Sequence, residues 1–170
     1  MGDPSRGFQV GATAETGQAP MRRMNIRLIV AGKPALAYAK TGTEEYLKRL
    51  ARFGNYELVT VRPGTRDEVS ARLLDRSRAC YRIALDERGE CLDTRAFAGR
   101  LAVLAARGEI KTLAFLIGAA DGHSPSLRET CDSVLTLSAF TLQHELALLV
   151  LLEQLYRVAS LQSGAPYHRD

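Results

Sequence analysis

The chain has 170 residues, of which 46% are hydrophobic and 25% are charged, as in an ordinary globular protein of one domain. No run of about 18 uncharged apolar residues exists, because Glu145 and Glu153 bracket the longest one, which argues against a membrane protein. Three cysteines without Cys-x-x-Cys spacing argue against disulfides and a zinc site, and they favour a reducing, cytoplasmic location.

The net charge of +4 at pH 7 is unevenly distributed. Lys and Arg outnumber Asp and Glu by 13 to 6 in residues 22–78, whereas the counts are 9 and 11 in residues 79–170. A basic first half is the pattern expected of a face that binds phosphates. An arginine-rich solvated surface would give the same counts, so charge alone leaves both interpretations open.

Residues 1–23 are rich in Gly, Ala, Thr and Pro, show no periodicity and lack the apolar core of a secretory signal. We expect a disordered extension over residues 1–23 and one domain over residues 24–170.

Strand and helix patterns alternate along the rest of the chain. Alternating or continuous apolar runs predict strands at 26–31, 56–61, 81–86, 112–117 and 133–137. Amphipathic spacing predicts helices at 36–53, 66–79, 94–107 and 125–130, with a turn at Gly89 and a helix cap at Asp93. This order predicts an α/β fold with an open, mostly parallel sheet and helices on both faces.

A long last helix follows the segment 137–142 and continues to about residue 161. It is apolar on almost every side, which is typical of a buried helix, and we infer from this that a partner subunit helps to cover it. Glu153 and Arg157 are four residues apart and predict an ion pair on one stripe of the helix.

Three segments with glycine or small polar residues follow predicted strands, at 85–89, 117–122 and 137–142. Ligands of parallel sheets bind beyond the carboxyl ends of the strands, so we expect a ligand between these segments. The loop from Gly118 to Gly122 matches neither GxGxxG nor a P-loop, and alone it is more typical of a plain turn than of a binding loop. His144 alone would fit a capping or packing histidine.

Five short motifs occur in a fixed order, and together they are specific. They are Leu85-Asp-x-x-Gly89, Leu116-Ile-Gly-x-x-x-Gly122, Leu137-Ser-x-x-Thr-x-x-His144, Glu153-Gln-Leu-Tyr-Arg157 and Pro166-Tyr-His-Arg169. Over residues 24–170 the chain resembles the bacterial large-subunit ribosomal RNA pseudouridine N3-methyltransferases of the SPOUT class.

The resemblance implies a C-terminal deep trefoil knot, which the general rule against knots would have excluded. It also implies a homodimer that uses S-adenosyl-L-methionine to methylate N3 of a pseudouridine in a 23S rRNA hairpin loop of the assembled ribosome. The cofactor-binding residues that it implies are Leu85, Gly118, Leu137, Ser138, Ala139, Phe140, Thr141 and Leu142.

By the same resemblance, His144, Tyr167 and His168 lie near the target base, Arg157 and Arg169 contact RNA, and no metal takes part. Two positions depart from the family pattern: Ala119 replaces a second glycine, and Leu148 replaces an arginine four residues after the histidine. These departures leave open a ribosome-binding SPOUT module without catalytic activity. A further alternative is a SPOUT methyltransferase that acts on another RNA such as tRNA, against which the terminal Tyr-His-Arg argues.

Overall fold

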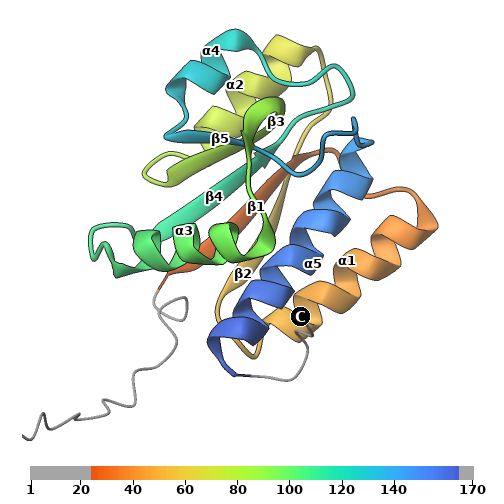
Figure 1. The fold of residues 1–170 in the computed structure, drawn as a ribbon. Helices are drawn as coiled ribbons and strands as arrows, with labels where there is room; N and C mark the ends of the chain where they lie inside the picture. The colour runs from red at the N-terminus through yellow and green to blue at the C-terminus, as the bar shows by residue number, and fades with distance from the viewer. Residues whose placement is uncertain (1–23, 165–170) are drawn as a thin grey trace, which may run out of the picture.

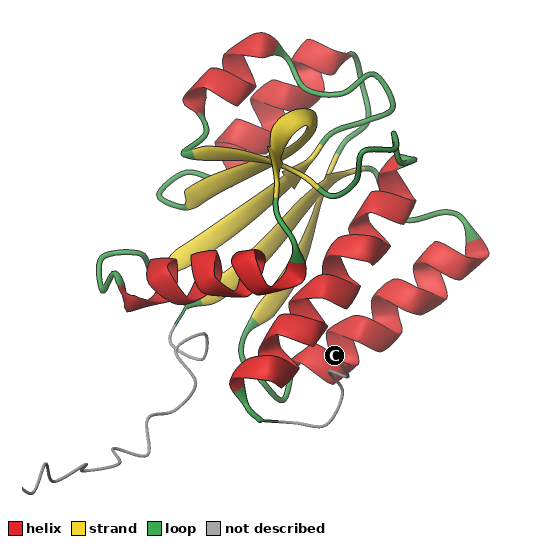
Figure 2. Ribbon diagram, viewed as in Figure 1, coloured by secondary structure: helices red, strands yellow, loops and turns green. Residues whose placement is uncertain are grey.

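The computed structural model describes residues 24–164, and within them five strands alternate with five helices (Figures 1 and 2). The strands are β1 (Asn25–Ala31), β2 (Tyr56–Val61), β3 (Tyr81–Cys91), β4 (Thr112–Ile117) and β5 (Ser133–Thr136). The helices are α1 (Ala37–Leu50), α2 (Arg66–Arg76), α3 (Thr94–Ala106), α4 (Pro125–Thr130) and α5 (His144–Gln162). The predicted extension at 1–23 lies outside the described residues.

The strands form one sheet in the order β2-β1-β4-β3-β5, and all neighbouring strands are parallel. The larger apolar core lies between the sheet and α1, α3 and α5, and a smaller core lies on the opposite face under α2 and α4 (Figure 1). Phe115 of the central strand β4 is fully buried in the larger core. The predicted open α/β sheet with helices on both faces is therefore confirmed.

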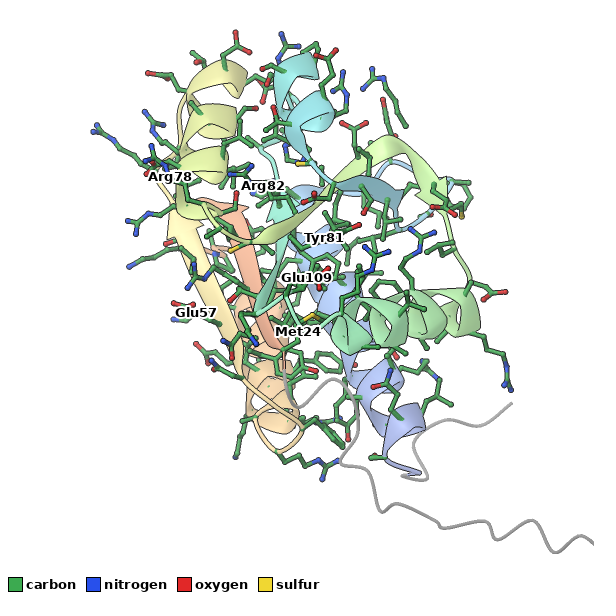
Figure 3. The ribbon with its side chains drawn as sticks, turned by 90° about the vertical axis from the view of Figure 1, so that its left-hand side faces the viewer. Met24, Glu57, Arg78, Tyr81, Arg82 and Glu109 are labelled. Carbon is green, nitrogen blue, oxygen red and sulfur yellow. The ribbon has the colours of Figure 1, made fainter. Side chains whose placement is uncertain are left out.

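The amino ends of the strands meet at the edge opposite the predicted ligand site. Figure 3 labels Met24, Tyr81 and Glu109, which stand at or just before the starts of β1, β3 and β4. Met24, just before β1, is only 2% exposed and belongs to the larger core. Within residues 24–164, no helix combines the length and the hydrophobicity that a membrane-spanning segment requires.

Helix starts follow from side-chain caps. Thr65 and Glu68 form a reciprocal capping box at α2, and Asp93 accepts the backbone N–H of Ala96 at α3, as predicted. The predicted helix 66–79 is wrong at its end, because Ser77 closes the last turn by donating its hydroxyl to the carbonyl of Leu73. The predicted helix 36–53 likewise ends earlier, at Leu50, and its last three residues form turns.

The third strand differs most from the sequence prediction. Instead of turning at Gly89, β3 continues to Cys91 and pairs a second time with β5, so that both Leu85 and Glu90 oppose Leu135. The residues between the two pairings bulge out at the carboxyl edge of the sheet. Gly89 permits this crossing, since a Cβ atom built on it would lie 2.4 Å from the carbonyl carbon of Leu135.

The last helix packs mainly on α1, although β5 lies at the other edge of the sheet from β2. Residues 137–143 must therefore cross the carboxyl ends of the strands to connect β5 with α5. The chain itself buries about half of α5, including Leu148, Leu151 and Leu155. Burial of this helix thus requires less help from a partner than its composition indicated, and the homodimer stays a prediction.

Candidate functional site

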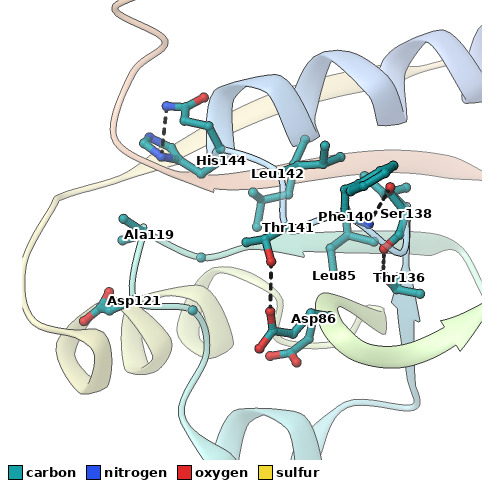
Figure 4. A pocket seen from close by; sticks show the side chains of 18 of the residues that line it. Leu85, Asp86, Ala119, Asp121, Thr136, Ser138, Phe140, Thr141, Leu142 and His144 are labelled. Carbon is teal, nitrogen blue, oxygen red and sulfur yellow. Dashed lines mark hydrogen bonds between the residues drawn. The ribbon is translucent and has the colours of Figure 1, made fainter.

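The three segments expected to surround a ligand meet at the carboxyl edge of the sheet around a cavity of about 420 Å³. Such a volume is within the range of small-molecule sites. Figure 4 shows its wall, formed by the β3 bulge, the loop after β4 and the crossing segment before α5. The lining residues are Leu85, Asp86, Glu87, Arg88, Ile117, Gly118, Ala119, Ala120, Asp121, Gly122, Thr136, Leu137, Ser138, Phe140, Thr141, Leu142, Gln143, His144 and Ala147.

The β3 bulge is held by Asp86, whose side chain is only 4% exposed. Its carboxylate accepts the backbone N–H of Arg88 at 3.0 Å and the guanidinium of Arg128 from α4 at 3.3 Å. Burial alone would raise the pKa of Asp86, but these donors together with the Arg88 guanidinium hold that pKa below its ordinary value. Asp86 is therefore a fixed anion in the wall of the cavity.

The second loop is closed by Gly122, which has a φ of 76° and donates its N–H to the carbonyl of Ala119 at 2.9 Å. Gly118 is enclosed, because a Cβ atom there would lie 3.0 Å from the Gly122 oxygen and 3.1 Å from Nδ1 of His123. His123 is 2% exposed and donates from Nε2 to the Leu116 carbonyl at 3.1 Å. Burial lowers the pKa of His123, so the ring that packs against this loop is a neutral imidazole.

The crossing segment is fixed by its own short side chains. Thr136 donates its hydroxyl to the carbonyl of Ser138 at 2.8 Å, and the N–H of Phe140 donates to Oγ of Ser138 at 2.9 Å. Thr141 reaches the carboxylate of Glu87 in the bulge at 3.4 Å. The Phe140 side chain is 84% exposed at the mouth of the cavity, so an aromatic face is available to an incoming molecule.

His144 begins α5 at the rim of the cavity. The cap of this helix is Gln143, whose side-chain oxygen accepts the N–H groups of Glu145 and Leu146 at 2.9 and 3.0 Å. The amide nitrogen of Gln143 lies 3.3 Å from Nδ1 of His144. The histidine is thus not the capping residue, and its half-buried ring is oriented by its neighbour.

Comparisons with known proteins agree with this geometry. A family profile described as "Predicted SPOUT methyltransferase" matches residues 24–168. This chain belongs to the SPOUT methyltransferase family. It is 48% identical to a Ribosomal RNA large subunit methyltransferase H of Thermus thermophilus and 39% identical to that of Deinococcus radiodurans. Each match covers 86% of this chain and 99% of the relative.

Solved structures show the same SPOUT fold at low sequence identity. A probable methyltransferase from Bordetella pertussis aligns with a TM-score of 0.57 and 18% identity, covering 83% of this chain and 98% of the other. A tRNA (m1G37) methyltransferase from Aquifex aeolicus aligns with a TM-score of 0.54 and 15% identity, covering 86% and 75%. Family membership implies that the crossing residues 137–143 belong to the expected trefoil knot.

In this SPOUT chain, seven of the eight predicted cofactor residues line the cavity, and Ala139, which is exposed, does not. Predicted RNA ligand Arg157 lies on α5 and donates to Glu153 at 2.6 Å, which is the expected ion pair. Tyr167, His168 and Arg169 lie outside the described residues. Sequence reasoning assigned no role to Asp86 or Gln143, although each lies within a quoted motif.

A second cavity of about 290 Å³ adjoins the first and shares Leu85, Thr136 and Leu137 with it. Its walls combine apolar side chains such as Phe97 and Leu151 with polar groups that include Thr94, which donates to the side-chain oxygen of Gln154 at 2.8 Å. Among residues 24–164, no group of three or more histidine, cysteine or carboxylate side chains is placed to hold a metal ion.

Proposed function

We propose that this chain uses S-adenosyl-L-methionine to methylate N3 of a pseudouridine in a 23S rRNA hairpin loop, acting on the assembled ribosome in the cytoplasm. The supporting observation is the convergence of segments 85–89, 117–122 and 136–144 on one cavity, in a SPOUT chain 48% identical to a ribosomal RNA large subunit methyltransferase. Hairpin loops expose unpaired bases, which proteins recognise more readily than duplex RNA.

The cavity fits S-adenosyl-L-methionine in the nature of its walls. Leu85 and Leu137, which line both cavities, offer apolar surface that suits the flat adenine base. Backbone groups of residues 137–142 can pair with the edge of that base. Gly118 lets the second loop approach closely, because any side chain there would meet the Gly122 carbonyl. When bound, the cofactor supplies a methyl group on a sulfonium, which is a good leaving centre.

The chain's own task is to align the base and accept the proton from N3. We propose that His144, Tyr167 and His168 surround the target base and that one of them takes this proton. His144 stands at the cavity rim with its ring held by Gln143. Arg169 would contact the RNA backbone, and Arg157 would do so while it remains paired with Glu153.

A homodimer completes the proposal. Leu146 and Val150 are only partly buried and lie four residues apart on α5, so they give this helix an apolar stripe that a second copy can cover. We propose that residues 165–170 of one subunit act at the cavity of the other. Equilibrium sedimentation at micromolar concentration should then give twice the mass of the chain, and a monomer would contradict this part of the proposal.

The second candidate is a ribosome-binding SPOUT module without turnover. Leu148 favours it, because this position, an arginine in the resembling enzymes, is 1% exposed and belongs to the larger core here. Ala119 gives weaker support to this second candidate than Leu148 does. The backbone of Ala119 is not left-handed, and its carbonyl accepts the N–H of Gly122 as part of an ordinary turn.

The deciding experiment measures transfer of labelled methyl groups from S-adenosyl-L-methionine to intact ribosomes, separate subunits, free rRNA and tRNA. The RNA is taken from a strain that lacks the modification. Incorporation into assembled ribosomes at a pseudouridine is the expected result. Cofactor binding without incorporation would favour the binding module, and incorporation into tRNA would favour a different RNA substrate.

A further inference from the structure

Glu145 is a buried carboxylate that the proposed chemistry does not use. It follows His144 in the first turn of α5, and it is 8% exposed. Its Oε2 atom accepts the backbone N–H groups of Ala35 and Leu36, each at 2.9 Å. These two amides belong to the connection between β1 and α1, which is more than 100 residues away in the sequence.

The carboxylate supplies what α1 lacks. The N-cap residue of α1 is Leu36, which has no side-chain acceptor, and the first turn of α1 contains no acidic residue. Free N–H groups at a helix start need acceptors, and a negative charge there interacts favourably with the helix dipole. Because Glu145 also lies in the first turn of α5, one carboxylate stabilises the starts of two helices.

The hydrogen bonds from Ala35 and Leu36 to Glu145 fix the loop between β1 and α1 at the end that leads into α1. At its first end Gly32 has a φ of 75° and donates its N–H to the carbonyl of Val61 at 2.9 Å. Lys33, which follows, is exposed. The Oε1 atom of Glu145 lies 3.9 Å from Nε2 of His144. The same carboxylate therefore contacts this loop through Oε2 and lies beside His144 at the rim of the cavity.

We propose that Glu145 is a positioning residue that fastens the Gly32–Leu36 loop to the first turn of α5, so that Lys33 binds an RNA phosphate beside the His144 end of the cavity. The inference rests on the proposed function, because it specifies how the RNA is received at that site. Lys33 supplies the positive charge that attracts the phosphate, and Glu145 fixes the position of the loop that carries Lys33.

Three variants separate these roles. Glu145→Ala removes both hydrogen bonds to the loop, whereas Glu145→Gln keeps a carbonyl oxygen that can accept both amides and loses only the charge. Glu45→Ala is the matched control, since it removes an exposed carboxylate of α1 that pairs with Arg49 four residues later. Amide hydrogen exchange in the free protein reports on the loop, and methyl transfer to ribosomes gives KM and kcat separately.

We expect Glu145→Ala to speed exchange at Ala35 and Leu36 and to raise the KM for ribosomes about tenfold, because small misplacements of contact groups are costly. Its kcat should change by less than about threefold, since His144 lies outside the loop. Glu145→Gln and Glu45→Ala should stay within about twofold of wild type. Unchanged exchange or KM in Glu145→Ala, or equal damage in Glu145→Gln, would overturn the inference.

Lys33→Ala provides a second, independent arm. It should raise the KM for ribosomes and reduce the slope of log affinity against log salt concentration by about one, which corresponds to one phosphate contact. Amide exchange at Ala35 and Leu36 should not change. In the double variant with Glu145→Ala the KM should rise no further than in Glu145→Ala alone. Additive effects, or no effect of Lys33→Ala, would refute the role of the loop even if Glu145→Ala failed to fold.

Failure of the proposed function has a different signature. If wild-type protein transfers no methyl group to ribosomes, the proposed substrate is wrong. Exchange at Ala35 and Leu36 in the free protein then still decides whether Glu145 holds the loop.

Discussion

The carboxyl edge of the sheet has two halves that are built differently. At β3, β4 and β5, three loops enclose a cavity, and they are fixed by contacts between short side chains and backbone, such as Ser138 with Phe140. At β1 and β2 the loops are open, and they present exposed Lys33 and Arg62. The difference separates two tasks: the enclosed half suits a small cofactor, and the open basic half suits the phosphates of a large RNA.

The means of fixing the loops also differ between the halves. In the enclosed half the backbone of Gly89 crosses that of Leu135 so closely that no side chain fits between them. In the open half Arg72 of α2 donates to the carbonyls of Arg62 and Pro63 at 2.9 and 3.0 Å, which leaves the outward side chains free to vary. Substitutions should therefore have large effects in the first half and small ones in the second.

The largest effect is expected from Gly89→Ala. Its Cβ atom would lie 2.4 to 2.6 Å from backbone atoms of Leu135, which cannot move without breaking the pairing of β3 with β5. We expect a loss of about 3 kcal/mol or more in the free energy of unfolding, measured with urea, and loss of cofactor binding. Gly99→Ala in α3, where a Cβ atom meets nothing within 4 Å, should instead stabilise by about 0.5–1 kcal/mol. Equal stability of the two variants would contradict this account of the crossing.

The next largest effect concerns the chemistry in the enclosed half. If His168 acts at the target base, His168→Ala should reduce kcat for methyl transfer about 100-fold or more and leave cofactor affinity within about twofold, because the cavity wall within residues 24–164 is unchanged. Calorimetry gives the cofactor affinity and labelled methyl transfer gives kcat. Equal losses of both would assign His168 to the cofactor.

The sequence predicted those parts of both halves that depend on local signals. The bounds of β2, β4 and α4 agree with the structure, since apolar runs and the Ser124-Pro125 start are visible within a few residues. The extension of β3 to Cys91 could not be foreseen, because it depends on pairing with β5, about 45 residues later. The knot required the family resemblance, since the rules of chain topology exclude it.

Site residues divide in the same way. Gly118 and the segment 137–142 follow strands in a parallel sheet, so their meeting could be expected, because the carboxyl ends of parallel strands lie at one edge of the sheet. The role of Asp86 depends on Arg128 from α4, and that of Gln143 depends on the exact start of α5. The contact between Asp86 and Arg128 leaves no spacing signal, because the two residues are brought together only by the tertiary fold. The cap at Gln143 is local, but glutamine is not among the preferred N-cap residues, so its sequence gives little indication of that role.

A smaller effect is expected from Asp86→Asn. Since the pKa of Asp86 is held below its ordinary value, the ionised carboxylate stabilises the fold above the unfolded-state pKa of about 3.9, and this contribution is lost as the pH falls through the lower folded-state pKa. We expect the variant to be less stable than wild type by roughly 1–3 kcal/mol at pH 7. The difference should shrink below about pH 4. Urea unfolding between pH 2.5 and 7 tests this, and exposed Asp121→Asn is the control.

The smallest effect belongs to the open half. Arg62→Ala removes one exposed guanidinium near the carboxyl end of β2, while Arg107→Ala removes one at the end of α3, on the amino edge of the sheet. If the carboxyl edge receives RNA phosphates, Arg62→Ala should weaken ribosome binding about threefold and reduce the salt slope by about one. Arg107→Ala should leave both unchanged. Because both variants lower the net charge equally, a similar loss in both would mean that total charge attracts the RNA, whereas a loss confined to Arg62→Ala locates the phosphate contact beside the cavity.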